Sequence, residues 1–148
     1  MAQLNGDEGA LLLKHFDSIT PENIMKPESI APGKGKIYVW DVVNEPVNVS
    51  SLRESEWLKI IGEDYIEKAF YRAHEADQEA KLFLNEIDTI EKIKREYICN
   101  LVQGLIDKGV PIHGIGLQLH ISLDYPSLEA LDAALEQYSK LGLEIHIT

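Results

Sequence analysis

The strongest constraint on the fold is a repeated alternation of short β-rich runs and amphipathic helical segments. The β-rich runs begin near residues 37, 81, 114 and 143, and a segment with helical spacing of apolar residues follows each of the first three. Strands joined through a helix pair in parallel, whereas antiparallel neighbours need only a short turn. The alternation therefore predicts an α/β fold with a parallel sheet. It is equally compatible with a (β/α) barrel and with an open, flavodoxin-like sheet.

The pattern predicts four strands joined by three helices. Ser51–Glu54 resembles a capping box in front of the first helix, Thr89 precedes the second, and Ser127 begins the third. Gly109 and Gly142 are typical of positions where a helix ends. The expected strands are Lys36–Val43, Lys81–Leu84, Gly114–Gln118 and Leu143–Ile147.

The apolar faces of these helices indicate the core. Trp57, Ile93 and Leu128 fall on the apolar stripes, so we expect their side chains to be buried. Trp40 and Trp57 could each stack on a sugar ring, but their place in apolar stripes favours core packing. Cys99 lies near the stripe of the second helix and is interpreted as a small, buried or half-buried residue.

The chain before residue 36 is less regular. Gly9–His15 could form a short helix and Phe16–Thr20 a strand that leads into Pro21. Lys26–Lys36 is rich in turn-forming residues and leaves no room for a helix. The regular alternation therefore begins near Lys36.

Composition excludes several classes of protein. The 148 residues carry 14 basic and 25 acidic side chains, a formal net charge of -11, which disfavours nucleic acid and anionic membranes as partners. A single cysteine excludes an intrachain disulfide framework and a multi-cysteine zinc site. We find no apolar run of about 20 residues and no signal peptide. The absence of a glycine-rich phosphate loop predicts no nucleotide cofactor.

Polar residues gather just after the expected strands, at Asn44-Glu45, Asn85-Glu86 and Gln118-x-His120. Both parallel architectures place their chemistry at this end of the sheet. Glu45 follows a buried strand directly, so partial desolvation would raise its pKa and allow it to act as a general acid. The alternative is a solvated loop carboxylate that caps the next helix.

Gln118 and His120 alternate along a strand end and point to the same face. Such a pair suits hydrogen bonding to a polar ligand or to a carboxylate, although a lone histidine at a strand end is more often structural. His120, His146 and Glu45 lack the spacing of a metal-ligand set, so we predict no metal.

Four segments in order resemble glycoside hydrolase family 10, the endo-1,4-β-xylanases. Trp40–Pro46 is similar to the acid/base motif of the family, and Thr20–Glu28 to its second-strand motif. Gly114–His120 is similar to the sixth-strand motif, and Glu144–Thr148 to the seventh strand just before the catalytic nucleophile. The resemblance covers nearly the whole chain and implies a TIM barrel, a hydrolase acting on xylan or xylo-oligosaccharides, and secretion.

The resemblance also implies roles for individual residues. Glu45 would be the general acid/base of a retaining mechanism, and Asn44 would hydrogen-bond the 2-hydroxyl of the sugar that is cleaved. Gln118 and His120 would orient the nucleophile and the sugar. The residues implied to bind the neighbouring xylose are Glu22, Asn23 and Lys26.

The chain departs from the family pattern in several places. The family's nucleophilic glutamate follows the Ile147-Thr148 pair, where this sequence ends. The third strand is absent, with a join near residues 32–36, and Ile87 stands where the family has a tyrosine. We therefore expect residues 1–148 to form a partial (β/α)8 barrel with about five or six of eight strands, an internal deletion and exposed edges that favour self-association.

Three hypotheses follow for the function. The chain is a partial family-10 xylanase whose activity on its own is small, or a non-catalytic module that binds xylo-oligosaccharides or assembles with another chain. An unrelated α/β domain is disfavoured by four matches in order.

Overall fold

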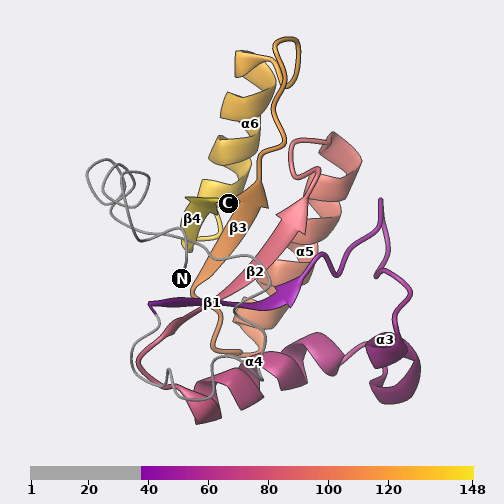
Figure 1. Ribbon diagram of the computed structural model, residues 1–148, viewed down its shortest axis with the longest axis vertical. Coiled ribbons are helices and arrows are strands. Elements are labelled where there is room, and N and C mark those ends of the chain that lie inside the picture. Colours follow the sequence, from indigo (N-terminus) through magenta and orange to yellow (C-terminus); the bar gives the residue numbers. More distant parts are fainter. Residues whose placement is uncertain (1–37) are drawn as a thin grey trace, which may run out of the picture. The chain divides into compact units, whose positions relative to one another are not determined.

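The computed structural model describes residues 38–148, which form one four-stranded parallel sheet with helices packed on one face (Figure 1). The predicted parallel α/β fold is thus confirmed for this part of the chain. The expected elements before residue 36, the join near residues 32–36, and Glu22, Asn23 and Lys26 lie outside the described residues. The strands are β1 Val39–Asn44, β2 Lys81–Ile87, β3 Gly114–Gln118 and β4 Glu144–Ile147, and the helices are α3 Glu56–Ile61, α4 Tyr65–Ala76, α5 Lys92–Asp107 and α6 Leu128–Ser139.

The strands lie in sequence order, β1-β2-β3-β4, with every pair parallel. The register pairs Asn44 with Asn85, and Ile87 with Gln118, so the carboxyl ends of the first three strands share one edge. The β1–β2 pairing shifts between Asp41 and Val43, which indicates a bulge at Val42, two residues before the end of β1. The chain order therefore brings all the polar strand ends to the same rim.

The core fills the space between the sheet and its helices. Leu82 and Leu84 of β2 and Ile115 and Leu117 of β3 point to this side, and all four are fully buried. Because side chains alternate along a strand, the intervening residues point to the other face. The core residues that α4, α5 and α6 contribute include Ile66, Phe70, Ile98, Val102, Ala134 and Tyr138.

The opposite face of the sheet carries charged and polar residues. Lys81 and Glu144 form an ion pair across it. The His146 ring lies 4.4 Å from that of Phe83, centroid to centroid. Burial raises the pKa of Asp41, and the nearby His146 opposes that shift. This face therefore combines charged and polar side chains with the buried ring of Phe83, unlike the apolar face that packs on the helices.

The first predicted helix is in fact two helices. Gly62, at a φ of 97°, ends α3 and separates it from α4. The N-cap of α3 is Ser55, whose hydroxyl accepts a hydrogen bond from the Leu58 amide at 3.1 Å. The predicted capping box at Ser51–Glu54 was therefore wrong, because the helix begins four residues later and its true cap has no glutamate partner three positions on.

Three predicted core residues are exposed instead. Trp57 is 66% exposed, Ile93 61% and Leu128 79%. Trp57 belongs to α3, a six-residue helix with no buried residue. Ile93 and Leu128 lie in the first turns of α5 and α6, which extend beyond the carboxyl ends of the strands in Figure 1. Helical periodicity identifies the face of a helix but not where the sheet beneath it ends.

Other expectations for single residues are confirmed. Ser127 caps α6 by accepting a hydrogen bond from the Ala130 amide, and Gly109 and Gly142 both have positive φ after a helix. Trp40 is half-buried against the core, and so is Cys99, whose pKa is raised by burial. Within residues 38–148, no helix is both long enough and apolar enough to cross a membrane.

Candidate active site at the carboxyl ends of the strands

Glu45 stands at the turn that ends β1. Its backbone has a φ of 52°, a left-handed conformation that a residue with a side chain rarely adopts. Its N–H donates to the carbonyl of Asn85 at 2.8 Å, which ties the turn to β2. Pro46 has no N–H, so the strand ladder cannot continue. The turn therefore places the Glu45 side chain just beyond the carboxyl end of the sheet.

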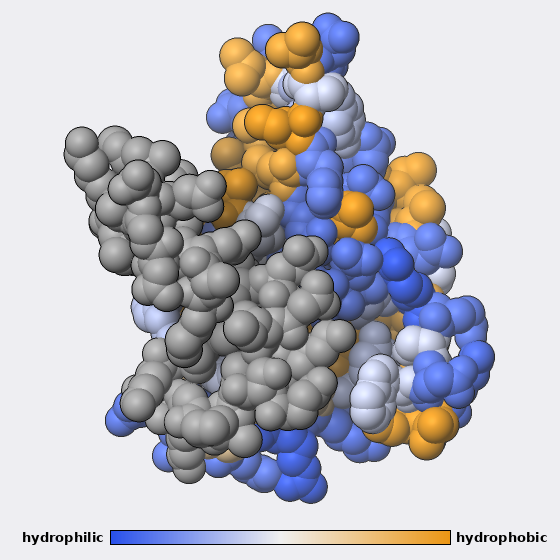
Figure 2. Space-filling view, viewed as in Figure 1, coloured by the Kyte–Doolittle hydropathy of each residue, from blue (hydrophilic) through white to orange (hydrophobic). Residues whose placement is uncertain are grey.

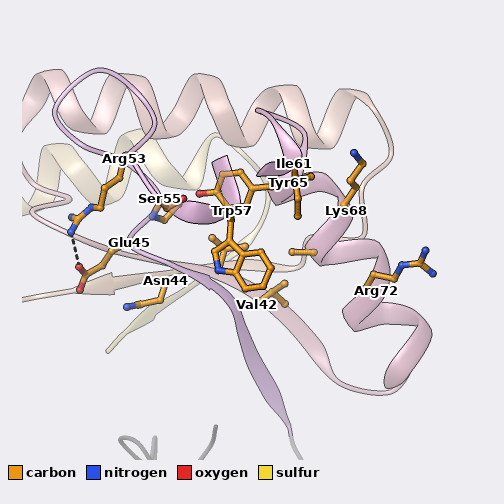
Figure 3. A pocket seen from close by; sticks show the side chains of 13 residues that line it. Val42, Asn44, Glu45, Arg53, Ser55, Trp57, Ile61, Tyr65, Lys68 and Arg72 are labelled. Carbon is orange, nitrogen blue, oxygen red and sulfur yellow. Dashed lines mark ion pairs between the residues drawn. The ribbon is translucent and has the colours of Figure 1, made fainter. Parts of the chain in front are cut away.

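The carboxylate of Glu45 is held from two sides. Its Oε1 accepts a hydrogen bond from Gln118 Nε2 at 3.3 Å, and its Oε2 lies 3.3 Å from Nη1 of Arg53 (Figure 3). The side chain is 28% exposed, so it is partly shielded yet reachable from solvent. Glu45 is therefore not a fully solvated loop acid, which was the alternative that the sequence left open.

Gln118 joins the ends of β1 and β3. Besides Glu45, its Nε2 reaches Oδ1 of Asn44 at 3.2 Å. Its Oε1 lies 3.3 Å from Nε2 of His120. The structure thus brings Asn44, Glu45, Gln118 and His120 into one continuous hydrogen-bonded network, here called the strand-end network. The predicted common face of Gln118 and His120 is confirmed.

Asn85 and Thr148 extend this network; the sequence placed Asn85 among the polar residues at the strand ends but gave neither residue a role. Asn85 Nδ2 donates to Asn44 Oδ1 at 2.8 Å, and Thr148 Oγ1 donates to Asn85 Oδ1 at 2.7 Å. Asn44 Oδ1 therefore accepts from both Asn85 and Gln118. Because the oxygen of Asn44 is used in this way, its NH₂ group is left to donate, and in Figure 3 its nitrogen points away from Trp57.

Glu86, which the sequence placed among the polar residues at the strand ends without giving it a role, faces the helices. Its side chain is fully buried, and Oε1 forms an ion pair with Nζ of Lys94 at 3.0 Å. Oε2 accepts from the amide of Val47 at 2.8 Å, and Oε1 also accepts from the amide of Ile87 at 3.0 Å. Glu86 and Asn85 are consecutive in β2, so their side chains point to opposite faces of the sheet. Glu86 faces the helices and contacts the Glu45 turn from that side.

A cavity of about 700 Å³ opens beside Glu45, between the end of β1 and helices α3 and α4 (Figure 3). Trp57 and Tyr65 contribute aromatic surface, and Arg53, Lys68 and Arg72 bring positive charge to its margin. Each of these cations has an acidic partner, namely Glu45, Asp64 and Glu75 respectively. The cavity is thus a mainly apolar space next to the strand-end network.

The described residues do not assemble a metal centre. His146 lies on the polar face of the sheet beside Phe83, whereas Glu45 and His120 belong to the strand-end network. Across residues 38–148, no group of three or more His, Cys, Asp or Glu side chains could hold a metal ion. The chemistry available at this rim is that of a carboxylate with amide and imidazole neighbours.

Comparison with known proteins gives a consistent answer. Residues 32–148 match the sequence model of glycosyl hydrolase family 10. An endo-1,4-beta-xylanase of Geobacillus stearothermophilus is 52% identical over 118 residues, which cover 78% of this chain and 36% of that protein. An endo-1,4-beta-xylanase A of a Caldicellulosiruptor species is 50% identical over 119 residues, 78% of this chain and 17% of that protein. The chain thus spans little more than a third of these curated relatives, or less.

Solved structures show the same relationship. Xylanase XynB of Paenibacillus barcinonensis, complexed with a conduramine derivative, superposes with a TM-score of 0.78 at 42% identity, covering 82% of this chain and 38% of that one. A mutant of an intracellular xylanase from Thermoanaerobacterium saccharolyticum, in complex with xylotetraose, gives a TM-score of 0.76 at 43% identity, with 82% and 39% covered. These relatives share the arrangement of strands and helices described above.

Proposed function

The chain belongs to glycosyl hydrolase family 10, and from that premise we propose that it carries the acid/base half of an endo-1,4-β-xylanase site. The substrate is xylan or xylo-oligosaccharides, and the bonds cleaved are internal β-1,4 linkages. The observation that carries the proposal is the Glu45 carboxylate, held between Gln118 and Arg53 on the same rim as Asn44.

Glu45 is proposed as the general acid/base. In the first step its proton passes to the glycosidic oxygen as the bond to the leaving sugar breaks. In the second step the resulting carboxylate removes a proton from the attacking water. Its partial burial and its two fixed neighbours support this role, because a general acid must be held near the oxygen that it protonates.

Asn44 is proposed to hydrogen-bond the 2-hydroxyl of the sugar that is cleaved. Its oxygen is already used by Asn85 and Gln118, which orients the amide group as a donor toward the site. Gln118 and His120 are proposed to orient the nucleophile and the sugar. Glu22, Asn23 and Lys26 are proposed, from the family resemblance alone, to bind the neighbouring xylose.

A retaining mechanism needs a second carboxylate about 5–5.5 Å from the first. Among the described residues, Glu86 is the acid nearest in sequence to the rim network, but its carboxylate is committed to Val47, Ile87 and Lys94 on the helix side. The family pattern has the nucleophile directly after Ile147-Thr148. We therefore propose that this residue range supplies the acid/base and that the nucleophile belongs to the position after Thr148.

Azide can replace a carboxylate nucleophile, so it provides a direct test with the 148-residue chain. The chain is incubated with xylotriose with and without sodium azide, and the release of xylose and xylobiose is measured. We expect azide-dependent cleavage in which azide bonds to the anomeric carbon and the Glu45 proton passes to the leaving oxygen. The Glu45→Gln variant should lose this cleavage by at least 100-fold, because it has no proton to donate. Equal cleavage by Glu45→Gln would contradict the assignment.

The second candidate is a module that binds xylo-oligosaccharides without cleaving them. The observation in its favour is that the side-chain partners of the Glu45 carboxylate within residues 38–148 are Gln118 and Arg53, neither of them an acid. Calorimetry with xylotriose, beside the azide assay, separates the two candidates. Heat of binding without cleavage in azide would favour the module, and no heat at millimolar xylotriose would exclude it.

The extent of the domain and the cellular location remain proposals. We propose that residues 1–148 form one partial catalytic domain with a deletion near residues 32–36, in line with a family match that begins at residue 32. Secretion is a prediction from the resemblance, whereas the relative from Thermoanaerobacterium saccharolyticum is described as an intracellular xylanase.

A further inference from the structure

The turn that carries Glu45 is fixed by two consecutive residues of β2. The Glu45 N–H donates to the carbonyl of Asn85, and the Val47 N–H donates to the carboxylate of Glu86, both at 2.8 Å. Pro46, between the two donors, has no N–H. Every backbone donor from Glu45 to Val47 is therefore bound to the Asn85-Glu86 pair.

The acceptor on Val47 is a charged group in a fully buried position. A buried carboxylate is costly unless it is paired and its oxygens are hydrogen-bonded. Glu86 meets both conditions, with Lys94 as its counter-ion and the Ile87 and Val47 amides as further donors. Lys94 is itself buried, so solvent competes little for either partner.

The left-handed conformation of Glu45 explains why the hydrogen bond between Val47 and Glu86 matters. Non-glycine residues leave that region unless surrounding contacts hold them there. Gln118 contacts only the side chain of Glu45, whereas Arg53 pairs with that side chain and also donates its N–H to the carbonyl of Pro46 at 2.7 Å. The backbone N–H groups of Glu45 and Val47 are bound by β2, so β2 holds the two donor positions on either side of Pro46.

We propose that Glu86, paired with Lys94, is a positioning residue that holds the acid/base Glu45 in its left-handed turn. The proposal rests on the proposed function only in calling Glu45 the acid/base. Glu86 touches no part of the strand-end network with its carboxylate, so it acts through the turn and not on the sugar.

The chemistry of a carboxylate is essential to this role. Glu86 accepts hydrogen bonds at both oxygens, and a glutamine has one oxygen and one NH₂ group. In Glu86→Gln, either the Val47 amide or the Ile87–Lys94 side must face an NH₂ group. In the double variant Glu86→Met/Lys94→Met, both charges are gone, and such replacements of a buried pair commonly preserve folding. The Val47 amide then has no acceptor from position 86.

The test is amide hydrogen exchange of the 148-residue chain followed by NMR, without any sugar. Val47 is compared with Val102, a fully buried residue of α5, so that a general loss of stability is separated from a local one. Tyr138→Phe is the matched control, because it removes a buried hydrogen bond, from the Tyr138 hydroxyl to the carbonyl of Thr89, that has no contact with the turn.

We expect the Val47 amide to exchange at least tenfold faster, relative to Val102, in the Glu86→Met/Lys94→Met variant and in Glu86→Gln if that variant folds. The carboxyl ¹³C resonance of Glu45 should shift in the same variants. Tyr138→Phe should leave both readouts unchanged. If Val47 and Val102 lose protection together, or if Glu45 is unaffected in the folded double variant, the proposal is overturned. Since no sugar is present, this result is independent of whether Glu45 proves to be the acid/base.

Discussion

Gly116 shows how closely single residues are packed beneath the strand-end network. A Cβ built on Gly116 would lie 2.4 Å from Oδ1 of Asn85, closer than any real contact allows. The clash falls on the atom that accepts the hydrogen bond of Thr148. Position 116 must therefore lack a side chain, because the Asn85 side-chain amide occupies the space that a Cβ would need.

We predict that Gly116→Ala destabilises the protein by about 1–3 kcal/mol, as overpacking of a buried position does. Gly104 provides the matched control, because it lies within α5 and a Cβ there would meet nothing within 4 Å. Gly104→Ala should instead stabilise the protein by about 0.5–1 kcal/mol through helix propensity. Urea unfolding of the two variants measures the difference, and equal effects would refute this account of Gly116.

At the scale of elements, His113 ties the start of β3 to β2. Its Nδ1 accepts a hydrogen bond from the Leu82 amide at 3.1 Å, which requires that nitrogen to be unprotonated. Burial lowers the pKa of His113 below 6.5, and the nearby His74 and Lys81 lower it further. Protonation of His113 is therefore disfavoured in the folded chain and would break its hydrogen bond with the Leu82 amide.

We predict that His113 makes the free energy of unfolding decrease as the pH falls through 6.5. Below that value the unfolded chain binds a proton at His113 before the folded chain does, so acid favours unfolding. In His113→Asn the amide oxygen can accept from Leu82 without titrating, and the pH dependence below 6.5 should become shallower. Identical slopes in urea unfolding series at several pH values would show that His113 does not contribute.

The strands and their parallel pairing could be predicted from the sequence, because β-rich runs separated by helices leave few topologies. The pattern alone left the strand order open, since a barrel and a flavodoxin-like sheet order their strands differently. The same reasoning found Asn44, Glu45, Gln118 and His120, since each lies at the carboxyl end of a strand or within two residues of it. It could not find the split between α3 and α4, where Gly62 interrupts a continuous apolar stripe. It named Glu86 among the strand-end polar residues but could not find its role, because periodicity cannot show that a charged residue there points inward and pairs with Lys94.

At the scale of the whole molecule, apolar side chains are exposed to solvent at two places. Figure 2 shows hydrophobic surface gathered over α6 and the loop before it. Leu123 and Leu128 are among the most exposed residues there, and Trp57 and Ile60 are exposed on α3. Among the described residues, β1 and β4 each pair with a single strand, as expected for part of a barrel. Exposed apolar patches and free sheet edges favour association.

We predict that the chain self-associates in a concentration-dependent manner in about 0.15 M salt, where repulsion between chains of net charge -11 is screened. Leu123→Lys/Leu128→Lys should shift sedimentation velocity profiles toward the monomer. Gln78→Lys/Asn100→Lys adds the same charge at exposed polar positions and should leave the association unchanged. A wild-type chain that sediments as a monomer at all concentrations would contradict the prediction.

The central claim is that the strand-end network is a site for xylose units. It is tested most directly by following the side-chain amides of Asn44 and Gln118 in ¹⁵N NMR spectra while xylotriose is added to the 148-residue chain. The account predicts saturable shifts of these two amides at about millimolar xylotriose, and no such shifts with maltotriose, whose linkages are of the α type. Unchanged Asn44 and Gln118 resonances at ten times that concentration of xylotriose, on the order of 10 mM, would contradict it.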